Sequence, residues 1–156
     1  MNKTLIFTEA NQINIWQKID EIALVLMKFD RDYDPFLMYG EAGIQLFLFH
    51  RCFELDDEEC YAKVADKYFQ NIDNIHKKTL FIDDPQECNA GLAGGLSGIG
   101  WMLDYMIRYP MIDADLFEVM GSADPKVFRR MIYDVQEDRY NLLQGAAGIA
   151  LYCVNG

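Results

Sequence analysis

Apolar and polar positions alternate with helical spacing in three stretches of the chain. In residues 12–29 apolar side chains recur every three or four positions, and the same spacing returns over residues 61–76 and 127–135. A period near 3.6 residues places apolar side chains on one face of an α-helix and polar side chains on the other. These stretches therefore predict amphipathic outer helices. The first stripe consists of Ile15, Trp16, Ile19, Ile22, Ala23 and Leu26.

Two of these helices follow stretches that favour a helix start. The segment LDDEEC, residues 55–60, precedes the second stripe, and its carboxylates suit a helix N-terminus by capping and by interaction with the helix dipole. A metal site is the alternative interpretation of this acidic run. The segment GSADP interrupts residues 113–138. There we expect Asp124 to cap the next helix and Pro125 to take its first position.

Three further stretches are apolar almost all round, which is typical of helices buried on every side. They read YGEAGIQLFLFHRCF, GGLSGIGWMLDYMIRY and LQGAAGIALYCV. Each contains a G-x-x-G-I motif, and the motif glycines are Gly40, Gly43, Gly95, Gly98, Gly145 and Gly148. The motifs start 55 and 50 residues apart, at positions 40, 95 and 145, which is the length of a helical hairpin with its loops. The pattern predicts α/α repeats in which outer and inner helices alternate.

The motif glycines need a structural reason, because each glycine inside a helix costs roughly 1 kcal/mol relative to alanine. Glycines three residues apart share one face of the first helical turn, so a neighbouring backbone can come close there. We also expect the three inner helices to run parallel with their N-termini at one mouth. Such N-termini would form an electropositive rim for peptide carbonyl or carboxylate groups.

These motifs resemble those of the lanthionine synthetase C-like (LanC-like) family, whose inner helices open with G-x-x-G-I. GGLSGIGWML and LLQGAAGIALY look like family signatures, and MYGEAGIQLF is a weaker copy. The resemblance covers nearly the whole chain and implies an all-α domain over residues 1–156 with toroid-type hairpin repeats. The implied outer/inner hairpins span about residues 12–52, 56–108 and 113–154. Family members close about seven hairpins into a ring, so the resemblance implies an incomplete arc, the N-terminal part of a larger protein.

The resemblance also implies a function for the complete protein. Family cyclases join a cysteine thiol to a dehydrated Ser or Thr of a precursor peptide, which gives the thioether bridge of a lanthipeptide. Their zinc is held in segments of Trp-Cys-Tyr-Gly and Cys-His-Gly type, and neither occurs here: Cys153 precedes Val154, and His50 precedes Arg51. No catalytic residue or zinc ligand carries over. We therefore expect this chain alone to hold no zinc or other cofactor and to have no cyclase activity.

Two other functions stay open. The first is a non-catalytic α-solenoid module that binds a peptide or protein on one face. The second is a glycosidase-type toroid, which needs paired carboxylates at the ends of inner helices; Glu41 and Asp104 occur, but not at corresponding positions. A zinc site from His50, Cys52, Cys60 and His76 is disfavoured, because residues two apart do not share a helix face.

Charge and hydropathy restrict the partners and the location. Fourteen Lys and Arg against 25 Asp and Glu give a net charge of −11, which repels nucleic-acid phosphates and anionic lipids. The longest weakly polar stretch, residues 90–103, is shorter than the roughly 20 residues that span a bilayer. The first ten residues lack the apolar region of a secretory signal. These features predict a cytoplasmic protein without nucleic-acid or membrane partners.

The cysteines and the last inner helix give two further expectations. Cys52, Cys60, Cys88 and Cys153 form no CxxC pair, so we expect four free thiols and no disulfide in a reducing compartment. The inner helix of residues 146–154 has no following hairpin in this sequence. We expect apolar surface at that repeat edge and self-association through it.

Overall fold

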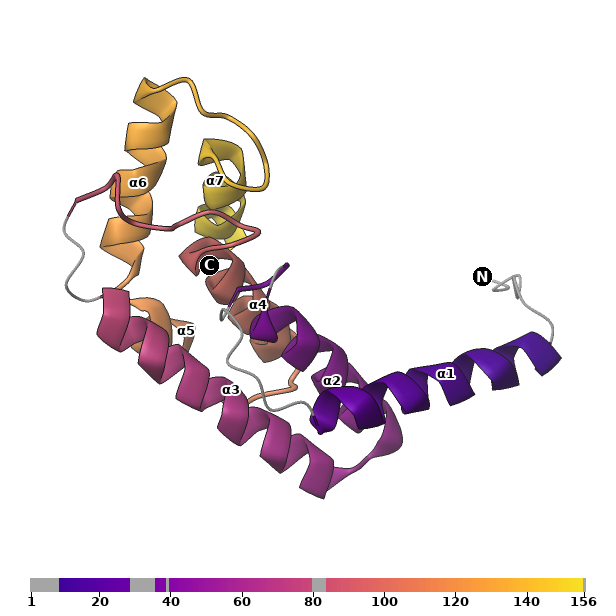
Figure 1. The fold of residues 1–156 in the computed structure, drawn as a ribbon. Coiled ribbons are helices and arrows are strands. Elements are labelled where there is room, and N and C mark those ends of the chain that lie inside the picture. Colours follow the sequence, from indigo (N-terminus) through magenta and orange to yellow (C-terminus); the bar gives the residue numbers. More distant parts are fainter. Residues whose placement is uncertain (1–8, 29–35, 39, 80–83, 156) are drawn as a thin grey trace. The chain divides into compact units, whose positions relative to one another are not determined.

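The computed structural model describes residues 9–28, 36–38, 40–79 and 84–155, and every regular element in these ranges is an α-helix (Figure 1). This confirms the all-α prediction for the described part of the chain. The chain divides into two units, residues 1–32 and 33–156. The first unit contains α1 (Glu9–Met27). The second contains α2 (Glu41–Leu55), α3 (Glu58–Thr79), α4 (Leu96–Arg108), α5 (Leu116–Met120), α6 (Asp124–Gln136) and α7 (Ala146–Asn155).

The inner helices α2, α4 and α7 supply much of the core of the second unit. Phe49, Met102, Leu103, Met106 and Ile149 are completely or almost completely buried. Helix α4 packs against α2, α5 and α7. The outer helix α3 packs against α2, which precedes it, whereas α6 packs against α7, which follows it. The second and third apolar stripes predicted from the sequence therefore lie on helices that pack against inner ones, α3 on α2 and α6 on α7.

The starts of the two outer helices in this unit are set differently. Asp57 precedes α3, and its Oδ1 accepts a hydrogen bond from the Cys60 N–H at 2.9 Å, which confirms the predicted acidic cap. The capping prediction for Asp124 is wrong. Ala123 precedes α6 with near-helical dihedral angles, so the helix begins one residue earlier, at Asp124 itself. The Asp124 carboxylate instead accepts a hydrogen bond from the Tyr152 hydroxyl at 2.6 Å, which joins α6 to α7.

A glycine loop leads into each of α4 and α7 and folds back over the start of its own helix. These loops comprise residues 89–95 and 139–145, and the described residues 36–38 and 40 precede α2. A Cβ at Gly43, Gly98 or Gly148 would collide with the carbonyl oxygen six residues earlier, that of Leu37, Leu92 or Leu142. The close backbone that the motif glycines admit is thus mainly the helix's own loop. No described glycine has a positive φ, so close approach explains the motif and backbone conformation does not.

Hydrogen bonds join the three loops side by side. The Met38 N–H donates to the Ala93 carbonyl at 3.0 Å, and the Ala93 N–H donates to the Leu143 carbonyl at 2.8 Å. These three residues each lie two positions before the first motif glycine. The bonds place the N-terminal ends of α2, α4 and α7 next to one another. This confirms that the three motifs start at the same end of the repeats.

Candidate functional site

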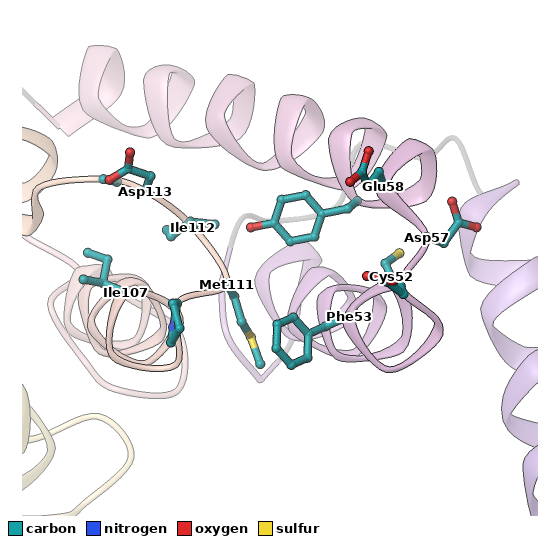
Figure 2. Close-up of a pocket in the computed structure, with 12 residues that line it drawn as sticks. Cys52, Phe53, Asp57, Glu58, Ile107, Met111, Ile112 and Asp113 are labelled. Atoms are coloured by element: carbon teal, nitrogen blue, oxygen red, sulfur yellow. The ribbon is translucent and has the colours of Figure 1, made fainter.

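An open pocket of about 790 Å³ lies where α2 and α4 end and α3 begins. Its volume is in the range of pockets that bind small molecules or peptide side chains. Figure 2 shows the loop residues Met111, Ile112 and Asp113 opposite Phe53 and Glu58. The glycine motifs lie at the other ends of α2 and α4. The pocket is therefore separate from the residues that the sequence singled out.

The floor of the pocket is apolar and is held by backbone hydrogen bonds. Met111 and Ile112 are buried, and the Met111 N–H donates to the Met106 carbonyl at 2.8 Å, which folds the loop back over the end of α4. Phe53 is half exposed at the end of α2. An apolar side chain of a ligand would lose water contact against this floor. The six apolar lining residues are Phe53, Ile107, Pro110, Met111, Ile112 and Ala114.

The rim of the pocket carries four exposed carboxylates, those of Asp56, Asp57, Glu58 and Asp113. None of the lining residues is Lys, Arg or His. Within the described ranges, none of these four carboxylates forms an ion pair. Asp56 ends α2 in the left-handed conformation, with φ 54°, which Asp tolerates better than most residues. The chain thus turns sharply between α2 and α3 and places consecutive acids at the pocket rim.

A disulfide between Cys52 and Cys60 joins the end of α2 to the start of α3 in the pocket wall, with the two Cα atoms 5.8 Å apart. The prediction of four free thiols is therefore wrong. The eight-residue separation brackets the tight turn between two antiparallel helices, and this turn brings the two side chains together. Sequence spacing alone did not reveal it, because the cysteines belong to different helices.

Aromatic packing supports the same wall. Phe49 on α2 makes edge-to-face contacts with Tyr61 and Tyr68 on α3, with ring centroids 5.4 and 6.0 Å apart. Tyr61 also lines the pocket, and its partial burial raises the pKa of its phenol. Tyr61 therefore stays protonated at neutral pH and can donate a hydrogen bond to a ligand.

The prediction that helix N-termini at the glycine motifs offer free N–H groups to a peptide is wrong for α4 and α7, because these groups already donate hydrogen bonds. The first N–H groups of α4, those of Leu96, Ser97 and Gly98, donate to carbonyls of Asn89, Ala90 and Gly95. The Ala146 N–H of α7 likewise donates to the Arg139 carbonyl at 2.8 Å. The glycine loops thus satisfy these donors, which are not available to a peptide.

The remaining candidate residues lie apart from the pocket or in other interactions. Glu41 is buried and lies 3.5 Å from the Gln45 amide and 3.8 Å from the Lys67 ammonium, whereas Asp104 pairs with Arg108 at 2.8 Å. These pairings give both carboxylates structural roles. The His50 Nε2 lies 3.0 Å from the Tyr105 hydroxyl. The His76 side chain is outside the described residues.

The two other cysteines are free, Cys88 buried and Cys153 exposed. Desolvation raises the pKa of both thiols. For Cys88 this effect is larger than the lowering of the pKa by the nearby cations of α6.

In the described part of the chain, no group of three or more His, Cys, Asp and Glu side chains is arranged to hold a metal ion. A search of the described helices for one long and apolar enough to cross a bilayer finds none.

Comparison with protein-family models, with curated proteins and with solved structures finds no match to this chain. The site must therefore be interpreted from its own geometry. Sequence reasoning missed the pocket because its walls come from residues 52–61 and 107–114. The acidic run Asp56 to Glu59 was one available signal of the pocket rim, because only Asp57 in this run accepts the capping hydrogen bond at the start of α3.

Proposed function

We propose that this chain is a peptide-binding α/α-repeat module and that its pocket takes a basic, partly apolar peptide segment. The observation that carries the proposal is the combination of an apolar floor with four rim carboxylates and no lining cation. An apolar side chain of the peptide would fill the floor, while Lys or Arg side chains beside it would meet Asp113 and Glu58. The carbonyl ends of α2 and α4 add negative potential at the same place.

Electrostatics and burial have different parts in this binding. Exposed ion pairs contribute about 0.2–1 kcal/mol each, so the rim selects the charge of the peptide more than it determines affinity. Burial of one leucine-sized side chain contributes about 1.5–3 kcal/mol. The module therefore binds weakly through one pocket, as expected for a transient peptide contact.

The test is a titration of the full chain with a labelled peptide of alternating lysine and leucine, followed by fluorescence anisotropy. Glu58→Gln combined with Asp113→Asn should weaken binding about two- to thirtyfold, because two exposed charges contribute about 0.4–2 kcal/mol together. The matched control, Glu87→Gln with Glu118→Gln, removes two exposed acids outside the pocket and should leave affinity unchanged. Equal binding of a peptide with glutamate in place of lysine would overturn the proposal.

A second proposed function, part of a LanC-like lanthionine cyclase, is favoured by the repeated glycine loops. The same loop contacts recur around Gly43, Gly98 and Gly148, as a family built from repeated hairpins requires. In that case the basic segment would belong to a precursor peptide. Coding sequence that continues beyond Gly156 with more G-x-x-G-I motifs, one Trp-Cys and one Cys-His would support this function. A stop codon there would favour the binding module alone.

The zinc content and the location of the protein are two further proposals. We expect chelator-washed protein to contain no stoichiometric zinc, which metal analysis tests directly. The cytoplasmic location also stays a prediction, and the Cys52–Cys60 bond weighs against it, because disulfides persist mainly in oxidising compartments.

A further inference from the structure

The Cys52–Cys60 disulfide closes the loop that forms much of the pocket. Six of the twelve residues that line the pocket lie between positions 52 and 61, and Cys52 is one of them. Three of the four rim carboxylates, those of Asp56, Asp57 and Glu58, lie inside the loop that the bond closes. The disulfide therefore constrains half of the pocket lining and most of its charge.

Backbone hydrogen bonds also hold this loop, but they are long. The Asp56 N–H donates to the Phe53 carbonyl at 3.2 Å, and the Asp57 N–H donates to the Cys52 carbonyl at 3.1 Å. Both distances lie at the long end of the range for N–H···O hydrogen bonds. The disulfide is the one covalent link across the loop in the described part of the chain.

Repulsion between carboxylates works against the closed loop. Residues 56–59 are four consecutive acids. Glu59 is paired with Lys63 at 2.7 Å, whereas the other three have no ion pair within the described ranges. Neighbouring charges of one sign favour a more open loop, because separation lowers their repulsion. The disulfide opposes this opening.

The two helices on either side of the loop have contacts that do not depend on the disulfide. The Phe49 ring packs edge-to-face on Tyr61 and Tyr68, and Val64 and Ile72 on α3 are also buried. These contacts would remain after the bond is reduced. We therefore expect α2 and α3 to stay packed while the acidic loop between them gains freedom.

We propose that the Cys52–Cys60 pair is a redox switch for the pocket. The disulfide orders the acidic rim for a basic peptide, and reduction to two thiols releases the rim and weakens binding. This inference rests on the proposed function, since the peptide is the ligand assigned there. Oxidising surroundings would thus favour the binding form of the chain, and reducing surroundings the weakly binding form.

The reaction is thiol–disulfide exchange with a dithiol. Cys52 is 1% exposed and Cys60 is partly exposed, so an external thiolate reaches the Cys60 sulfur more readily. Its attack releases the Cys52 sulfur as a thiolate, which takes up a proton. The second thiol of the same dithiol then attacks the mixed disulfide and releases Cys60. The reductant ends as a disulfide and the protein as two thiols.

The first test compares the oxidised full chain with the chain reduced by dithiothreitol, using the labelled peptide of lysine and leucine. Reduction should weaken binding about tenfold if the ordered rim is then populated about a tenth of the time. Cys52→Ala with Cys60→Ala should bind as weakly as the reduced chain, with or without reductant. Cys153→Ser is the matched control: it removes a free, exposed thiol and should leave the response to reductant unchanged.

Linkage gives a second readout of the same switch. If the oxidised chain binds about tenfold more tightly, saturating peptide should shift the thiol–disulfide equilibrium about tenfold toward the disulfide. Alkylation and intact mass in a fixed dithiothreitol redox buffer measure this ratio with and without peptide. Equal peptide affinity of the oxidised and reduced chains would overturn the inference and leave the proposed function standing.

Hydrogen exchange tests the release of the rim without any peptide. Reduction should speed amide exchange in residues 53–59 and leave α4 as protected as before. Equal exchange in both states would overturn the inference, and so would a loss of helical circular dichroism on reduction, because the bond would then support the whole fold. An oxidised chain that does not bind the peptide, but whose loop is still released by reduction, would overturn the proposed function alone.

Discussion

The Arg130 guanidinium donates its Nε–H to the Asp134 carboxylate at 2.9 Å, one turn along α6, and the Asp134 side chain is fully buried. A second guanidinium nitrogen donates to the carbonyls of Gln86 and Cys88, at 3.1 and 2.6 Å. One side chain therefore neutralises a buried charge and ties α6 to the loop before α4. Loss of the Arg130 or the Asp134 side chain should therefore lower the stability of the fold, because the remaining partner would lose its hydrogen bond.

Arg130→Met should destabilise the fold by about 3 kcal/mol, the lower end for a broken buried pair, because it leaves the buried Asp134 carboxylate with only the more distant Arg139 guanidinium, 3.9 Å away. Urea denaturation gives the free energy of unfolding. Arg129→Met is the matched control and should change stability by less than about 0.5 kcal/mol, since Arg129 is exposed on the same helix. The double variant Arg130→Met with Asp134→Leu should recover much of the loss. Equal midpoints for the two single arginine variants would contradict this role.

Gly98→Ala should destabilise the fold by about 3 kcal/mol, the upper end of ordinary overpacking. The added Cβ would collide with the Leu92 carbonyl, which the loop cannot move without disturbing its hydrogen bonds. Ser97→Ala is the control: this serine is buried beside Gly98, and its hydroxyl has no hydrogen-bond partner among the described residues. Thermal unfolding should separate the variants by several degrees. Similar melting temperatures would show that the loop adapts to a methyl group.

Reduction of the Cys52–Cys60 bond should lower the free energy of unfolding by roughly 2–3 kcal/mol, from the chain entropy of a loop of this length. It should also weaken peptide binding, because the bond fixes the pocket wall between α2 and α3. Intact mass after alkylation, with and without reductant, measures the number of free thiols. Four alkylated cysteines in unreduced native protein would mean that the bond does not form.

Alkylation of the free thiols should require a higher pH than that of an ordinary cysteine. Burial raises the pKa of Cys88 and Cys153, so at any pH below those values the reactive thiolate fraction is smaller than in the unfolded chain. The alkylation rate of exposed Cys153 should rise with pH and reach half of its maximum at a higher pH than in urea-unfolded protein. Cys88 should react more slowly still, because it is buried. A half-maximum at or below that of the unfolded chain would refute the shift.

Local sequence patterns determined the helices of this protein. Periodic apolar residues predicted α1, α3 and α6, and the G-x-x-G-I motifs located the starts of α2, α4 and α7. Helix periodicity depends on residues within a few positions of one another, so it can be read without knowing the fold. The motif spacing likewise predicted that the three motifs lie at one end of the repeats, and the loop hydrogen bonds confirm this.

Tertiary structure decided which distant residues meet. The pocket combines Phe53 and Glu58 with Met111 and Asp113, residues more than 50 positions apart, and the disulfide depends on the turn between two helices. The sequence did not indicate that the glycines accommodate their own loops, nor that these loops satisfy the helix N-termini. Such contacts depend on how packed helices bring separate segments together, and the local periodicity of each segment is the same for many packings. Six of the seven described helices were therefore predictable from the sequence, whereas the short α5 and the candidate site were not.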